Sequence, residues 1–370
     1  MFNENREGVE EMTKPTIVDF FAGIGGIRMG FEREGFKCIY SNEINPFCAI
    51  TYKKNFGDDP TGDITIINEK DLPNFDVFLG GFPCQSFSIA GRKLGFNDTR
   101  GTMFFHIARI LKEKKPKAFL LENVKNLQRH DKGNTLQTIL NVLKNDLDYN
   151  VTCKVLNAKH FGVPQNRERI YIVGFRKDVF NGEFIFPTGN GNVKLKDFLE
   201  KNVPLKYFIS KKRLKGMKAH KARHQSKGNG FGYDILDPDN VAKAIVVGAM
   251  GRERNLVKDC ASLTQHKKDP EYENKNTEEC VRYLTPREYA RLQGFTDDFE
   301  IPVSNAQAYK QFANSVAIPV IGAVAKEMKK VLKCVQITFH CNLPVKFPEK
   351  ETNLRQNLLE LWKIIENYQT

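Results

Sequence analysis

The chain of 370 residues contains eight cysteines, but it has no Cys-x-x-Cys pair and no regular cysteine spacing. A zinc cluster or a disulfide framework would need thiols in such a pattern, so neither is expected. Scattered free thiols are typical of a reducing cytoplasm. The sequence therefore predicts free cysteines and no metal site.

The sequence also lacks long apolar runs and targeting signals. A membrane-spanning helix needs roughly 18 or more consecutive apolar residues, and no such run is present. No signal peptide, lipidation motif, internal repeat or low-complexity tract is visible either. We expect a soluble cytoplasmic protein, acting as a monomer, with no membrane partner.

What the chain does have is an excess of positive charge. It contains 57 Lys and Arg against 44 Asp and Glu, for a net charge of +13. Such an excess favours a polyanionic partner, although basicity alone does not identify one. The length is sufficient for one large hydrophobic core and a smaller second unit.

The hydrophobic pattern divides the chain into three parts. Over residues 1–186, short apolar runs such as 75–79 and 169–175 alternate with helical patterns such as 104–112 and 135–147. This alternation predicts an α/β fold with a doubly wound, mostly parallel, Rossmann-like sheet.

After Pro187 the composition changes. Residues 187–282 are rich in Gly, Asn, Lys and Arg and predict a small irregular or β-rich domain, with a strongly basic run at 211–224. Residues 283–370 return to the pattern of the large domain. Leu354, Leu358, Leu361, Trp362 and Ile365 predict an amphipathic helix that packs on the protein's own surface.

The most informative stretch is residues 80–88, GGFPCQSFS. A buried strand is expected immediately before it, so Cys84 lies on a Gly- and Pro-rich loop at a strand end. An α/β enzyme places nucleophiles at such positions. Free cysteines are usually small buried hydrophobes, but a loop of this composition is held open, which favours a nucleophilic role.

A second pattern, IVDFFAGIGGI at residues 17–27, predicts a strand, a glycine-rich turn and a helix. The turn lets a nucleotide-like ligand approach the backbone at the N-terminus of the following helix. Arg28 stands where dinucleotide-binding proteins have a third glycine. Glu43 follows the next apolar run at the spacing of a ribose-binding carboxylate; the alternative is a solvated surface residue.

The third pattern is an apolar strand at residues 117–124 that ends in Glu122 and Asn123. The carboxyl end of a strand in an open α/β sheet faces the ligand crevice. Burial there would raise the pKa of Glu122 and suit it to donate a proton.

Together these motifs resemble those of the DNA (cytosine-5)-methyltransferases of bacterial restriction-modification systems. The matching motifs occur in the family's order: DFFAGIGG at 19–26, GDI at 62–64, GFPCQS at 81–86, ENV at 122–124, QNRERIY at 165–171, LTPRE at 284–288 and QFANSV at 311–316. They cover roughly residues 15–185 and 281–332, which is most of the chain.

The resemblance implies the chemistry. Cys84 would add to carbon 6 of cytosine, and Glu122 would support N3 of the ring. Arg167 and Arg169 would face the base carbonyl, the Cys84 loop or a phosphate. Because the base is hidden in the duplex, it would be flipped out of the stack. The implied partner is double-stranded DNA near the nucleoid, and a cognate restriction endonuclease can act on the same site.

The implied cofactor is S-adenosyl-L-methionine. In this family it would contact a set of residues from five motifs: Phe20, Gly23, Gly25, Glu43, Asp63, Ile64, Pro83, Asn314 and Ser315. Glu43 would bind the ribose and Asp63 the adenine amino group. Ala313 and Ile44 depart from the family, which usually has glycine and an aromatic residue at these positions, and either change could weaken cofactor affinity.

Three alternatives remain at this stage. A tRNA cytosine-5 methyltransferase shares the cysteine and Glu-Asn motifs, but the Cys-Phe-Thr signature of that branch is absent. A catalytically silent DNA-binding relative would normally have lost Cys84 or Glu122. A nicotinamide dehydrogenase is disfavoured by the missing third glycine.

Overall fold

The computed structural model describes residues 14–83, 103–230, 232–248 and 252–340. Cys84 and the helix predicted around residues 354–365 lie outside the described residues, so the structure does not test their placement. No helix in the described ranges is long and apolar enough to cross a bilayer.

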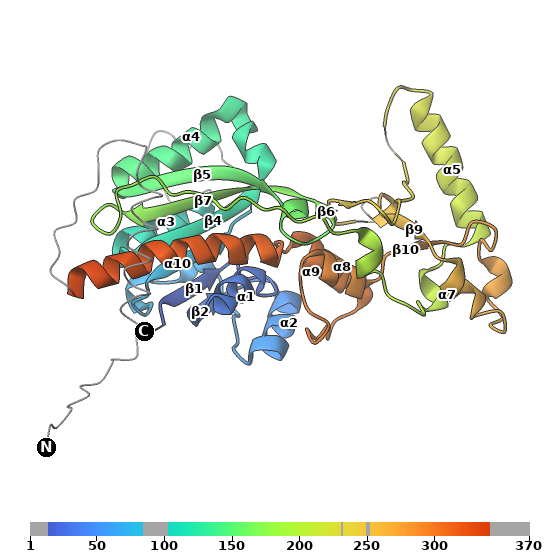
Figure 1. Cartoon of the computed structure of the whole chain (residues 1–370), viewed down its shortest axis with the longest axis horizontal. Coiled ribbons are helices and arrows are strands. Elements are labelled where there is room, and N and C mark those ends of the chain that lie inside the picture. The colour runs from blue at the N-terminus through green and yellow to red at the C-terminus, as the bar shows by residue number, and fades with distance from the viewer. Residues whose placement is uncertain (1–13, 84–102, 231, 249–251, 341–370) are drawn as a thin grey trace, which may run out of the picture.

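A six-stranded sheet forms the centre of the protein (Figure 1), in the order β2-β1-β3-β4-β7-β5. Its strands are β1 (Thr16–Phe20), β2 (Lys37–Asn42), β3 (Val77–Gly81), β4 (Ala118–Val124), β5 (Tyr149–Asn157) and β7 (Glu168–Arg176). The first four strands are mutually parallel, and β7 is antiparallel to both of its neighbours. The predicted mostly parallel sheet is therefore confirmed.

Helices cover both faces of this sheet (Figure 1). On one face α1 (Gly26–Arg33) packs against α10 (Ile318–His340), and their apolar side chains share one core with β1 and β3. On the other face lie α3 (Met103–Lys114) and α4 (Asn134–Asn141). An irregular turn of π-helix, Val142–Asp146, continues α4 to the end of the helix predicted from sequence. The inner strands β1, β3, β4 and β7 are largely apolar along both faces because each face is buried.

Three further helices lie beside the carboxyl ends of the strands: α2 (Pro46–Phe56), α8 (Pro286–Leu292) and α9 (Asn305–Asn314). Thr285 starts α8 with a capping box: its hydroxyl accepts from the N–H of Glu288, whose carboxylate accepts from the N–H of Thr285. This reciprocal pair satisfies two backbone donors that the first helical turn leaves without partners.

The described part of residues 187–282 is irregular, as predicted, but it is not rich in β structure. Its strands are short: β8 (Ala242–Lys243) pairs with β6 (Gln165–Asn166), and β9 (Leu256–Lys258) pairs with β10 (Val281–Tyr283). Its longest element is a helix, α5 (Lys211–Gln225), which stands at the end of the molecule farthest from the sheet (Figure 1). The sequence of α5 shows no apolar stripe, because many of its residues are charged and only two of its side chains are buried.

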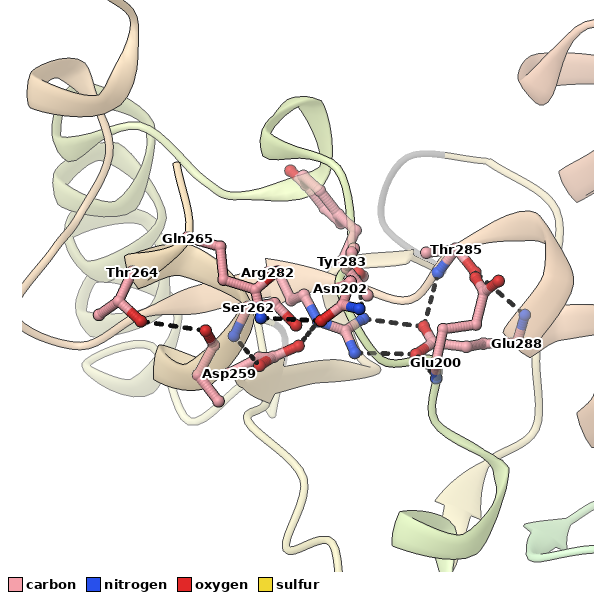
Figure 2. A network of polar contacts seen from close by, with 12 residues as sticks. Glu200, Asn202, Asp259, Ser262, Thr264, Gln265, Arg282, Tyr283, Thr285 and Glu288 are labelled. Carbon is pink, nitrogen blue, oxygen red and sulfur yellow. Dashed lines mark hydrogen bonds and ion pairs between the residues drawn. The ribbon is translucent and has the colours of Figure 1, made fainter. Parts of the chain in front are cut away.

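A buried ionic network joins this segment to the part of the protein built around the six-stranded sheet, which we call the large unit (Figure 2). Arg282 is wholly buried and donates to both carboxylate oxygens of Glu288 at 2.8 Å and to Asp259 at 2.8 Å. Asp259 caps the short helix α7 (Cys260–Thr264), whereas Glu288 belongs to α8. One arginine therefore connects the start of α7 to the start of α8.

The expectation that all cysteines are free is wrong. Cys260 and Cys280 form a disulfide, with their Cα atoms 5.0 Å apart. Cys38, Cys48 and Cys153 are free. Cys280 ends a loop and has a φ of 50°, and the pairing of β9 with β10 brings it beside Cys260. A separation of 20 residues without a repeated spacing gave no sign of this pairing in the sequence.

Candidate active site

The turn after β1 is shaped by backbone conformations that few side chains tolerate. Phe21 and Gly23 both have a φ of 55°, and Gly25, with a φ of 82°, caps the N-terminus of α1. A Cβ atom on Gly25 would lie 2.2 Å from the ring of Phe56. Glycine is thus required at this position by both conformation and space, and the turn presents its backbone at the edge of the sheet.

Glu43 faces this turn directly. One carboxylate oxygen accepts from the N–H of Gly23 and the other from the N–H of Asn45, both at 2.7 Å. Burial raises the pKa of Glu43, and these two N–H donors oppose that rise. The predicted carboxylate therefore lies at the glycine turn, where it could accept hydrogen bonds from a ribose.

The loop with Asp63 lies beside Glu43. The backbone N–H of Glu43 donates to Pro60, and the N–H of Gly62 donates back to the carbonyl of Glu43 at 3.1 Å. The carboxylate of Asp63 is partly exposed and accepts from the N–H of Thr65, which lowers the pKa of Asp63. Ile64 is different, because its side chain is buried in the core and only its backbone is left to face a ligand.

The structure corrects the expectation for Phe20. Its ring is wholly buried, with its centroid 5.0 Å from that of Phe78 in a stacked arrangement. Phe21, the next residue, is partly exposed at the strand end and has the strained φ given above. Phe21 lies just beyond the end of β1 and is the one of the two that retains exposure, so Phe21 rather than Phe20 is the aromatic residue that could contact a cofactor.

The Asn314–Ser315 pair is far away in the sequence but lies against the same glycine turn. A Cβ atom on Gly26 would lie 2.6 Å from the hydroxyl oxygen of Ser315. Asn314 is exposed and Ser315 is partly exposed, so both remain available to a ligand. The contact places the end of α9 against the start of α1.

The side chain of Arg167 connects segments around the glycine turn that are far apart in the sequence. Its buried guanidinium donates to the carbonyls of Ile245 and Ala313 at 3.0 Å and to that of Ser315 at 2.6 Å. With these donors committed to backbone carbonyls, Arg167 is a positioning residue. Arg167 lies immediately before β7, which begins at Glu168.

Arg169 is the arginine that contacts the predicted acid. Its Nε atom lies 3.2 Å from Oε1 of Glu122, and both side chains are largely buried. Burial raises the pKa of Glu122, while Arg169 and then Arg167 oppose the rise. A carboxyl group in this setting can retain a proton at a pH where an exposed one would lose it.

The chain that leads to Cys84 is fixed beside Glu122. Gly81, at the end of β3, pairs directly with Glu122 on β4. A Cβ atom on Gly81 would lie 3.6 Å from the Glu122 carboxylate. The side chain of Asn123 donates to the carbonyl of Phe82 at 2.9 Å, and the next residue, Pro83, is exposed. The residues that directly precede Cys84 therefore lie next to the buried acid.

This arrangement coincides with a known family. The family model described as C-5 cytosine-specific DNA methylase matches residues 15–330. The chain belongs to the C-5 cytosine-specific DNA methylases. It is thus a DNA cytosine-5 methyltransferase, and members of this family depend on S-adenosylmethionine.

Individual relatives agree with this membership. The chain is 52% identical to the Type II methyltransferase M.HpaII of Haemophilus parainfluenzae, over 86% of this chain and 90% of that protein. It is 50% identical to M1.ScrFI of Lactococcus lactis subsp. cremoris, over 89% and 81% of the two chains. It is 39% identical to M.HhaI of Haemophilus parahaemolyticus, over 85% and 94%.

Solved structures support the fold alone. The Entamoeba histolytica methyltransferase EhMeth has a TM-score of 0.65 at 20% identity, over 86% of this chain and 98% of that one. A Spodoptera frugiperda DNMT2 also reaches 0.65, at 22% identity, over 86% and 100%.

The motifs of this methylase site contain two residues whose roles were not predicted from the sequence. Asn123 fixes the chain before Cys84, and Gln165 donates to the carbonyl of Leu292 at 2.8 Å while accepting from the N–H of Ile245 at 3.0 Å. Both side chains are polar and buried, and the residue types alone did not reveal that burial. Ile44, at the departure from the family pattern, is 68% exposed, so an aromatic residue there would be free to contact a ligand.

Proposed function

We propose that this DNA cytosine-5 methyltransferase uses Cys84 as its nucleophile and Glu122 as the proton donor to a flipped-out cytosine in duplex DNA. The observation that carries the proposal is the pairing of Gly81 with Glu122, reinforced by the hydrogen bond from Asn123 to Phe82. These contacts bring the strand before Cys84 to a buried carboxyl group. The family membership supplies the reaction.

The roles follow from the chemistry of the ring. Carbon 5 of cytosine is a weak nucleophile, and addition of the Cys84 thiolate to carbon 6 makes it enamine-like. Glu122 gives its proton to N3 as negative charge builds there. After the methyl group is on carbon 5, loss of the proton from that carbon expels the thiolate and restores the ring.

The cofactor site is proposed at the glycine turn. S-adenosylmethionine supplies an electrophilic methyl group when bound. Glu43 is positioned to bind the ribose hydroxyls and Asp63 the adenine amino group. Asn314 and Ser315 would line the methionine end. The left-handed turn, the buried carboxylate at its N–H groups and the partly exposed Asp63 fit a nucleoside.

Residues 187–282 are proposed as the target-recognition domain, facing the catalytic edge across a DNA cleft. The supporting observations are the basic composition and the elements that lie apart from the sheet (Figure 1). Unstacking the base costs a few kcal/mol, which phosphate contacts from basic side chains could offset.

The biological setting is also proposed from the relatives. They are named Type II methyltransferases, which supports a protein that protects DNA against a cognate endonuclease. We propose further that it acts as a monomer at the nucleoid. The tRNA methyltransferase is the alternative substrate class. It is disfavoured because relatives named Type II methyltransferases reach 52% identity over most of the chain.

A methyl-transfer assay tests this proposal. The purified chain is given S-adenosylmethionine with a labelled methyl group, together with duplex DNA or tRNA, and bisulfite sequencing locates the product. We expect label in DNA at carbon 5 of cytosines within one short sequence. Glu43→Gln should raise the KM for S-adenosylmethionine more than it lowers kcat. Label in tRNA alone would contradict the proposal.

A further inference from the structure

Few side chains of the helix α5 pack against the rest of the protein. Ser210 caps its N-terminus by accepting from the N–H of Arg213 at 3.2 Å. Of its 15 residues only Leu214 and Met217 are buried, and they join a small cluster with Leu256 and Val281. The rest of the helix stands away from the catalytic edge (Figure 1).

Charge divides α5 into two sides. The helix has seven Lys and Arg and no Asp or Glu. Three of the cations are paired with carboxylates of neighbouring segments: Arg213 with Glu253, Lys218 with Glu279 and Lys221 with Asp234.

The other four cations are Lys211, Lys212, Lys215 and Arg223, and all of them are exposed. Among the described residues no carboxylate lies within 4.0 Å of these four. Their charges are therefore left for a partner.

These four cations form one face. Lys212, Lys215 and Arg223 are three and eleven positions apart, which places them on one side of an α-helix, opposite Leu214 and Met217. We call Lys211, Lys212, Lys215 and Arg223 the outer face of α5.

Small side chains between the cations leave the helix backbone uncovered on the outer face. Gly216 lies between its cations, and a Cβ atom there would meet nothing within 4 Å. Glycine costs a helix interior about 1 kcal/mol relative to alanine, so neither packing nor helix propensity explains it. Ala219 and Ala222 lie on the same side and are also exposed. A flat partner can therefore come close to the helix backbone.

We propose that the outer face of α5 binds the phosphate backbone of duplex DNA outside the recognition sequence, and supplies affinity without sequence preference. A 15-residue helix is about 22 Å long, which spans roughly six base pairs of a polyanion with one charge per 1.7 Å. The inference rests on the proposed DNA substrate. A membrane surface fits less well, because interfacial helices need exposed large apolar residues and both of those in α5 are buried.

The test removes the four charges. A variant with Lys211, Lys212, Lys215 and Arg223 replaced by Gln is compared with the wild-type chain on a long duplex that contains the recognition sequence and on one that lacks it. Binding is measured by fluorescence anisotropy over a range of salt. The log–log salt slope should fall by roughly 3 to 4 units, since each neutralised phosphate contributes about 0.9.

Affinity for both duplexes should fall equally, by roughly 10- to 1,000-fold at physiological salt. The ratio of specific to non-specific binding and the kcat at saturating DNA should stay unchanged. A duplex trimmed to the recognition sequence should bind both proteins alike.

Two matched proteins control for net charge and folding. Replacing the exposed Lys37, Lys144, Lys154 and Lys333 of the large unit by Gln removes the same charge and should change the slope by less than one unit. Replacing Lys211, Lys212 and Lys215 by Arg should retain the wild-type slope.

Equal slopes for the α5 and large-unit variants would overturn the inference. Loss of the specificity ratio would do so too, because it would make α5 a base-reading element. A wild-type chain that fails to methylate DNA would instead refute the proposed function.

Discussion

The Nε atom of Arg169 lies 3.2 Å from the Oε1 atom of Glu122, at the point where β7 and β4 present their side chains beside the end of β3. The carboxyl group is subject to two opposed influences. Burial favours its protonated form, and the arginine favours its ionised form. The balance between them sets the pH range in which Glu122 can give a proton to the base.

The first prediction concerns this balance. Activity should fall as the pH rises through the raised pKa of Glu122, because the proton donor is then lost. Arg169→Met removes an influence that lowers this pKa, so the fall should move to higher pH. Glu122→Gln should slow turnover by roughly 100- to 10,000-fold while leaving DNA binding largely intact. The pH dependence of kcat/KM measures both effects.

A neighbouring ion pair provides the control. Lys125 pairs with Glu168 at 2.9 Å on the surface, so Lys125→Met removes the same charge without touching Glu122. It should leave the pH profile in place. An Arg169→Met profile that moved to lower pH would contradict the proposed role of the pair.

The second prediction concerns residues 187–282. Exchanging residues 190–280 for the matching region of another methylase should transfer the donor's target sequence, as read by bisulfite sequencing. The exchange must preserve Glu200, whose N–H donates to Glu288 and whose carboxylate accepts from Thr285. The contact from Arg167 to Ile245 uses a backbone carbonyl, so it should survive a change of side chain. An active chimera with the original target would show that the reading domain lies elsewhere.

The third prediction concerns the network of Figure 2. Arg282→Met would leave Glu288 buried without its cation, and losing one partner of a buried ion pair costs about 3 to 5 kcal/mol. Urea denaturation should show this loss. Lys330→Met breaks the surface pair with Glu327 and should cost less than about 1 kcal/mol. Equal losses in the two variants would mean that the network does not stabilise the junction.

The fourth prediction concerns the disulfide between Cys260 and Cys280. Closing a loop of this length restricts the unfolded chain and is worth about 3 kcal/mol. Reductant should therefore lower the thermal midpoint, and the oxidised Cys260→Ser variant should already melt at the lower value. Cys48→Ser, which alters a free thiol, should keep the response to reductant. An equal thermal midpoint with and without reductant would show that the disulfide does not stabilise the protein.

The sequence predicted the sheet, and the strand ends at which Glu43 and Glu122 lie, for a physical reason. Strands buried on both faces are read as short apolar runs, and their carboxyl ends bear the functional groups, so Glu43 and Glu122 could be placed at the edge. Burial on both faces also removes the alternation that tells neighbours apart. For that reason Phe20 could not be distinguished from Phe21.

The contacts between distant segments were not predictable in the same way. The partners of Arg167 are backbone carbonyls of residues 78 to 148 positions away, and a carbonyl leaves no mark in the residue types. The pairing of Cys260 with Cys280 depends on how β9 meets β10. The helix α5 was hidden by its charge, since a helix that packs through only two residues lacks an apolar stripe.

The fifth prediction tests the central claim, nucleophilic attack by Cys84. Duplex DNA with 5-fluorocytosine at the target position should form a covalent complex with the wild-type chain in the presence of S-adenosylmethionine. Fluorine on carbon 5 cannot leave as a cation, so the elimination that frees the thiolate is blocked. Mass spectrometry should locate the adduct on Cys84, and Cys84→Ser should lose both the adduct and nearly all turnover, because a hydroxyl is not ionised at neutral pH as a thiol can be. A Cys84→Ser enzyme that methylates DNA at a near-normal rate would contradict the account.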